Sequence, residues 1–196
     1  MIESGTRRRE IDEVASDLFH ANGYAATSIR DIARALDIQG ASLYAHVASK
    51  EELLWAIVDR AATAFEQAAE RATTETASAD AVERLAALVE AHVETVTADP
   101  ERSSVFVTEW RYLSEPRRTT ISDRRDAYED QFRDAITRGI AVGSFRATDP
   151  AIGTTFILTA LNGIATWYRP AGRLSPDRIA DHYVELALRS LSEDHR

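Results

Sequence analysis

Small and polar side chains gather at residues 39–46 around one apolar pair. Leu43 and Val47 have the spacing of one face of a short helix over residues 41–47. When this pair is buried, the small or polar residues around it face outward: Gln39, Gly40, Ala41, Ser42, Ala45 and His46. Small side chains allow close approach of a backbone to DNA, and a glutamine matches the N6/N7 edge of adenine. This segment is therefore suited to recognition of duplex DNA.

Residues typical of catalytic or metal sites are missing or scattered. The chain has no cysteine, which excludes disulfides, thiolate zinc sites and cysteine nucleophiles. It also has no G-x-S-x-G, H-E-x-x-H, G-x-G-x-x-G or P-loop motif. Of the five histidines, His92 lies two residues before Glu94, so the two side chains point to different sides of a helix. We expect no enzyme activity, no metal and no cofactor.

Composition indicates a globular protein with an uneven charge. The 196 residues are 44% hydrophobic and 28% charged, which suits one domain or two small ones. The net charge is −9, but residues 1–50 carry six cations and seven anions. The N-terminal quarter is thus nearly neutral on an acidic chain, and phosphate contact there is permitted.

The sequence contains no sign of a membrane span or a signal peptide. No apolar run approaches the ~18–20 residues that a span needs. The basic triplet Arg7–Arg9 is not followed by an apolar stretch. Absence of cysteine fits a reducing compartment, so we expect a cytoplasmic protein. The triplet itself is either a solvated tail or an arm that contacts DNA.

Apolar residues recur with helical spacing almost throughout, and the sequence predicts an all-α fold with about nine helices. We expect them near residues 6–22, 28–36, 41–47, 50–65, 82–98, 105–113, 116–143, 151–168 and 176–191, with a loop at 73–80. A capping box at Ser49–Glu52 would open the fourth helix. Two short helices after a longer one form a helix-turn-helix, with Asp37 in the turn and Thr27 or Ser28 as the cap. We predict a DNA-binding domain at 1–48 and a helical ligand-binding and dimerisation domain at 49–196.

The N-terminal region resembles the DNA-binding domain of the TetR family of transcriptional repressors. The resemblance spans about residues 11–60 and is carried by TSIRDIARAL at 27–36 and ASLYAHVASKEELL at 41–54. It implies that Tyr44, Lys50 and either Thr27 or Ser28 contact phosphates of a double-stranded operator; the ring of Tyr44 can pack against the bundle as well. The chain departs from the family pattern at three positions, where Asp37, Gln39 and Val47 replace a turn glycine, a serine cap and an aromatic residue.

The last two predicted helices have apolar residues on more than one face, which implies a partner. The resemblance implies a homodimer through a four-helix interface, for which we name Leu158, Leu161, Tyr183 and Leu188. A two-fold dimer places two recognition helices ~34–36 Å apart, so that they read successive major grooves.

The remaining helices are expected to enclose an effector site. Its candidate residues are Phe106, Trp110, Arg111, Tyr128, Phe132, Phe156, Asn162 and Trp167, although aromatic residues at helical spacing more often belong to the core. Asn162 either bonds the ligand or pairs across the dimer, because an unpaired amide there would cost ~1–3 kcal/mol. The segments 109–113 and 167–183 are similar to the branch of the family that responds to acyl-coenzyme A thioesters, which implies a small apolar effector of that kind. The alternative is a helical small-molecule-binding protein that does not bind an operator.

Overall fold

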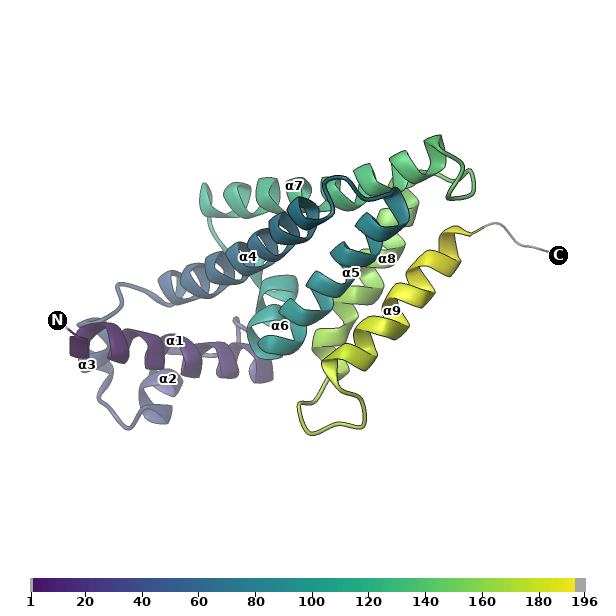
Figure 1. Ribbon diagram of the computed structural model, residues 1–196. Coiled ribbons are helices and arrows are strands. Elements are labelled where there is room, and N and C mark those ends of the chain that lie inside the picture. The colour runs from purple at the N-terminus through teal and green to yellow at the C-terminus, as the bar shows by residue number, and fades with distance from the viewer. Residues whose placement is uncertain (1, 193–196) are drawn as a thin grey trace. The chain divides into compact units, whose positions relative to one another are not determined.

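The computed structural model describes residues 2–192, with side chains from residue 6 (Figure 1). This part of the chain is helical and contains no strand, as predicted. The α-helices are α1 (Ile2–Asn22), α2 (Ile29–Ala35), α3 (Gly40–Tyr44), α4 (Lys50–Glu75), α5 (Ala81–Ala98), α6 (Pro100–Thr108), α7 (Arg117–Ala141), α8 (Pro150–Trp167) and α9 (Pro176–Leu191). A short 3-10 helix, η1 (Trp110–Tyr112), follows α6. None of the described helices is long and apolar enough to cross a membrane.

Contacts divide the chain into two compact units. Unit 1 runs up to Ala62 and includes Glu101–Ser122; unit 2 contains Thr63–Pro100 and the chain from Asp123 onward. Unit 1 thus adds the first half of α4 and the α6–η1 segment to the three N-terminal helices. The functional boundary between residues 48 and 49 stays a prediction.

The two short helices of unit 1 begin in different ways. Ser28 caps α2 in a capping box: its Oγ accepts from the Asp31 N–H (3.2 Å), and its own N–H donates to Asp31 Oδ2 (2.9 Å). Thr27, the other predicted cap, is buried, and its hydroxyl donates to the carbonyls of Leu18 and Gly23. Asp37 has a φ of 52°, the left-handed turn conformation that a short polar side chain tolerates.

Helix α3 is shorter than the predicted span of 41–47. The N–H groups of Ala45 and His46 donate to the carbonyls three residues back, so the chain tightens after Tyr44. Gln39 stands at the N-cap and makes no side-chain capping bond. At the start of α4, the Glu52 N–H donates to Ser49 Oγ as predicted, but the Glu52 carboxylate accepts from the Ala48 N–H instead of closing the box.

Unit 2 is built around α5. Leu85, Leu88, Val89, Val93 and Val96 of this helix are fully buried, and α5 packs against both α8 and α9 (Figure 1). Helix α4 continues to Glu75, into the predicted loop, because Ala68, Ala69 and Ala72 keep one face buried. The prediction of one helix over 105–113 was wrong in part, since α6 ends at Thr108 and the 3-10 turn follows.

Candidate DNA-binding and effector sites

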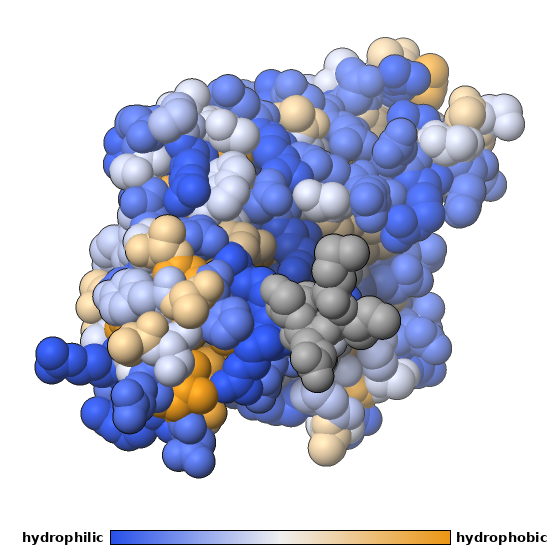
Figure 2. Space-filling model, turned by 90° about the vertical axis from the view of Figure 1, so that its left-hand side faces the viewer, coloured by the Kyte–Doolittle hydropathy of each residue, from blue (hydrophilic) through white to orange (hydrophobic). Residues whose placement is uncertain are grey.

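The segment 39–46 presents its small and polar residues outward. Leu43 and Val47 are buried, as the sequence predicts, and anchor the segment to unit 1. The residues exposed on it are Gln39, Ala41, Ser42, Tyr44, Ala45 and His46, and Gly40 is half-buried. Tyr44 is 56% exposed, so its ring does not close the bundle. The face drawn in Figure 2 is mainly hydrophilic, with small separate hydrophobic patches.

Lys50, the only lysine in the chain, joins the start of α4 to the turn before α2. Its Nζ donates to the carbonyls of Tyr24 and Thr27, each at 2.8 Å, and lies 4.1 Å from the centre of the Tyr24 ring. Burial lowers the pKa of Lys50. An ammonium has three N–H donors, so two carbonyls leave one for a phosphate.

Arg8 holds the end of the α3 segment. Its guanidinium pairs with Asp12 (3.0 Å) and Glu52 (2.8 Å) and donates to the carbonyl of His46 (3.2 Å). Asp12 is only 5% exposed and also faces Arg60 at 3.5 Å. Sequence reasoning placed Arg8 in a basic triplet and missed this role, which depends on contacts up to 44 residues away.

A second basic feature borders the same segment. Arg30 and Arg34, one turn apart on α2, are exposed and line an open hollow of about 390 Å³ with Asp37, Gln39 and Gly40. Arg34 pairs with Asp31 at 2.9 Å. The i, i+4 spacing of two arginines on a helix beside the predicted recognition segment was the available sequence signal.

The predicted effector residues fall into separate groups. Phe106, Trp110 and Arg111 belong to unit 1, where Arg111 is exposed and lies over the Trp110 ring at 5.2 Å. In unit 2, Tyr128 and Phe132 come together with a ring-centre separation of 5.6 Å. Phe156 and Trp167 are not part of this buried packing, since their side chains are 60% and 45% exposed. Asn162 is half-buried on α8.

A buried histidine that the sequence analysis left without a role lies beside Tyr128. His92 Nδ1 is 3.0 Å from the Tyr128 hydroxyl, and the ring of Phe65 is 4.9 Å from that of His92. Burial, together with the positive charge of Arg125, lowers the pKa of His92 to about 3. Burial raises the pKa of Tyr128. Both groups are therefore neutral at physiological pH.

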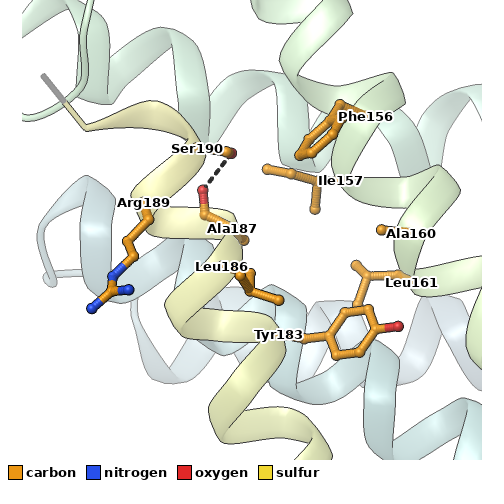
Figure 3. Close-up of a pocket in the computed structure, with 9 residues that line it drawn as sticks. All are labelled: Phe156, Ile157, Ala160, Leu161, Tyr183, Leu186, Ala187, Arg189 and Ser190. Atoms are coloured by element: carbon orange, nitrogen blue, oxygen red, sulfur yellow. Dashed lines mark hydrogen bonds between the residues drawn. The ribbon is translucent and has the colours of Figure 1, made fainter. Parts of the chain in front are cut away.

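Helices α8 and α9 border an apolar groove of about 470 Å³ (Figure 3). Phe156, Ile157, Ala160 and Leu161 line it from α8, and Tyr183, Leu186, Ala187 and Ser190 from α9. Phe156 and Leu186 are about 60% exposed. Arg189 also borders the groove, with its guanidinium directed away from it (Figure 3). Of the four predicted interface residues, Leu161 and Tyr183 line the groove, Leu158 is buried within the unit and Leu188 is half-buried. Phe156 and Leu186 were missed as interface candidates.

Comparisons with known proteins assign this arrangement to a family. Residues 11–57 match the model described as "Bacterial regulatory proteins, tetR family", and residues 78–191 match "Tetracyclin repressor-like, C-terminal domain". The chain is 31% identical over 195 residues to the HTH-type transcriptional repressor KstR2 of Mycobacterium tuberculosis, covering 96% of this chain and 94% of that protein. The chain belongs to the TetR family.

Solved TetR-family structures share the fold. The ketosteroid transcriptional regulator KstR2 of Mycobacterium tuberculosis superposes with a TM-score of 0.88 at 29% identity, over 96% of each chain. AibR, solved in complex with isovaleryl coenzyme A and operator DNA, gives a TM-score of 0.80 at 31% identity, over 92% of this chain and 97% of AibR. As a member of the TetR family, the chain is a ligand-responsive transcriptional repressor and not an enzyme.

Proposed function

We propose that this TetR-family repressor binds a palindromic operator as a homodimer and leaves it when a small apolar effector binds. The observation that carries the proposal is the segment 39–47, in which Leu43 and Val47 are buried while the small and polar residues face outward. A helix as short as α3 is not stable alone. Its fixation by Leu43, Val47 and Arg8 supports a role as a rigid reading element for the major groove.

Phosphate contacts would come from residues that surround this segment. Tyr44 carries an exposed hydroxyl, Ser28 an exposed hydroxyl at the start of α2, and Lys50 one remaining N–H donor. Both hydroxyls donate within the chain, Ser28 to Asp31 Oδ2 and Thr27 to the carbonyl of Leu18, but Thr27 is the weaker candidate because its hydroxyl is buried. Phosphate contacts fix register on the duplex, while the exposed side chains of Gln39 and Ser42 would meet base edges.

The groove between α8 and α9 supports a homodimer. Phe156 on α8 and Leu186 on α9 both line it and are about 60% exposed. The resemblance to the family implies that these two helices form the subunit interface. Large exposed apolar side chains gathered beside one groove are the kind of surface that a partner covers. Two-fold symmetry would bring four helices together and set the two α3 segments for adjacent grooves.

The effector is proposed to be small and apolar, or to carry an apolar acyl chain as an acyl-coenzyme A thioester does. Support comes from the aromatic cluster in unit 2, in which Phe65 and Phe132 are buried and Tyr128 is half-buried. The complex of AibR with isovaleryl coenzyme A supports the same class, because AibR shares this fold at 31% identity.

The deciding experiment selects a site from a random duplex library and measures affinity by fluorescence anisotropy. We expect a two-fold symmetric site bound by two subunits. Substitution Ser42→Glu should abolish binding, because it places a carboxylate against the duplex. The matched control Ser144→Glu carries the same charge outside unit 1 and should leave affinity intact. Selection without enrichment would refute operator binding and favour a helical small-molecule-binding protein.

A further inference from the structure

His92 has a polar atom that the surrounding protein leaves unsatisfied. The side chain is 2% exposed, and within the described residues its Nε2 has no hydrogen-bond partner. A buried donor or acceptor without a partner costs about 1–3 kcal/mol. Such an atom in the core of a ligand-responsive protein points to a group that arrives from outside the chain.

The hydrogen bond to Tyr128 determines whether His92 Nε2 is a donor or an acceptor. Tyr128 is half-buried. Burial of its phenol raises the pKa, so the hydroxyl keeps its proton, and the bond that the structure shows joins this hydroxyl to His92 Nδ1 at 3.0 Å. If Tyr128 donates, Nδ1 accepts, and the proton of the neutral imidazole must reside on Nε2. The opposite tautomer would leave two unmet groups, the phenol proton and the Nε2 lone pair. Nε2–H is therefore a donor that lacks an acceptor.

The surroundings of the ring restrict the acceptor further. The rings of Phe65, Tyr128 and Phe132 have centres 4.9, 5.9 and 6.5 Å from that of His92. A carboxylate here would gain from the positive charge of Arg125 that acts on His92, but it would lose its hydration among three aromatic rings. A ketone or thioester carbonyl loses much less water and accepts the same bond.

We propose that His92 is the polar anchor of an effector site in unit 2, and that the effector offers it an uncharged carbonyl oxygen carried on an apolar skeleton. Tyr128 acts as the positioning residue, since it sets the tautomer. This inference rests on the proposed effector response and adds to it the chemical class and the atom that is recognised.

The test uses the full chain without DNA, so that its outcome is separate from operator binding. Three probes share one skeleton: 4-phenylbutan-2-one, butylbenzene and 4-phenylbutanoate. Calorimetry compares their affinities for the natural protein and for the double variant His92→Phe/Tyr128→Phe, which keeps the aromatic rings and removes both polar groups. We expect the ketone to bind about tenfold more tightly than the hydrocarbon, and this ratio to fall to about one in the variant.

The single variant Tyr128→Phe separates a positioning role from a structural one. It releases Nδ1, so the tautomer is no longer fixed, and the ketone preference should fall while hydrocarbon affinity is retained. Nitrogen NMR of the His92 ring in the natural protein should show the proton on Nε2, with a shift of that resonance when the ketone is added.

Five results would overturn the inference. The first four are a proton on Nδ1, no measurable binding of the ketone, a carboxylate that binds more tightly than the ketone, and a ketone preference that survives in the double variant. An Nε2–H resonance unmoved by bound ketone would indicate that a buried water satisfies the atom, and would count equally against it. If the protein still binds its operator when one of these results is obtained, only this inference is refuted and the proposed operator binding stands.

Discussion

Glu109 Oε2 accepts a hydrogen bond from the backbone N–H of Tyr24 at 3.0 Å, which joins two residues 85 positions apart in the sequence. The carbonyl of the same residue, Tyr24, accepts from Lys50 Nζ at 2.8 Å. The turn before α2 is therefore held on one side by the α6–η1 segment and on the other by α4. The ring of Tyr24 adds a contact with Tyr112 at 5.5 Å.

Replacement of Glu109 by alanine should loosen this turn. A hydrogen bond to a charged acceptor contributes about 1.5–3 kcal/mol, so we expect Glu109→Ala to lower the free energy of unfolding by about 2 kcal/mol and to weaken operator binding. Glu109→Gln keeps an acceptor at the same position and serves as the matched control, with a smaller loss. Urea unfolding followed by circular dichroism measures the difference. Equal stability of the two variants would show that the bond does not hold the turn.

Lys50→Met tests the phosphate role of Lys50. The methionine keeps an apolar stem against Tyr24 and removes the charge, so affinity for all duplexes should fall alike. The slope of log affinity against log salt should fall by about one unit. Anisotropy titrations at several salt concentrations provide the measurement. If the slope is unchanged while stability drops, Lys50 serves only to tie α4 to the turn.

Arg8→Met tests a residue that we expect to position the α3 segment without contacting a phosphate. The structure gives Arg8 two carboxylate partners and the His46 carbonyl, so its loss should weaken operator binding through misplacement of the α3 segment. We expect the salt slope to stay as in the natural protein, because no phosphate contact is lost. Exposed Arg9→Met is the control from the same triplet and should have little effect on stability. A slope that falls by one unit in Arg8→Met would instead assign Arg8 to the DNA.

The sequence predicted the α3 segment because one apolar pair with helical spacing determined which side faces outward. It predicted helix α9 at residues 176–191, where Ser175 caps the helix and Pro176 opens it. Both features depend on residues within a few positions of each other, and such local rules can be read along a chain.

Contacts between distant residues could not be read in the same way. The bonds of Arg8 to Glu52, and of Glu109 to Tyr24, join side chains whose positions depend on how the helices pack. The same holds for the predicted effector set. Tyr128 and Phe132 share one helix face and meet as expected, whereas Phe156 lies on the outer side of α8 beside the groove. The aromatic residue type alone did not distinguish a core position from a surface one.

Neutral His92 should make stability depend on pH. Its pKa is about 3 in the folded protein, against about 6.5 for an unfolded chain. Between pH 3 and pH 6.5 the unfolded state binds more protons than the folded state. The contribution of the buried neutral imidazole to the free energy of unfolding is therefore complete above pH 6.5 and is lost as the pH falls toward 3. The loss approaches about 1.4 kcal/mol per pH unit for this one group.

Carboxylates titrate in the same pH range, so the effect of His92 is measured as a difference in the free energy of unfolding between two proteins. Urea unfolding of the natural protein and of the double variant His92→Phe/Tyr128→Phe is compared at pH 7, 6, 5 and 4.5. The stability gap between them should widen in favour of the variant as the pH is lowered. A constant gap would mean that His92 is protonated alike in the folded and unfolded states.

The groove between α8 and α9 leads to a prediction about assembly. Leu186 lines this groove and is 62% exposed, so Leu186→Glu should leave the fold intact while placing a charge in the proposed interface. We expect a dimer in the natural protein and a monomer in the variant, measured by sedimentation, with a loss of operator affinity of at least a hundredfold. Leu161, although it also lines the groove, is 1% exposed, and a charge there would unfold unit 2.

Val142→Glu supplies the control for this variant. Val142 is 72% exposed, belongs to the same unit and does not line the groove, so the added charge should change neither assembly nor affinity. A Leu186→Glu protein that remains dimeric would place the interface elsewhere. A variant that becomes monomeric yet binds the operator at full affinity would show that a single α3 segment suffices. Two-fold reading would then be excluded, because it requires both copies on the same duplex.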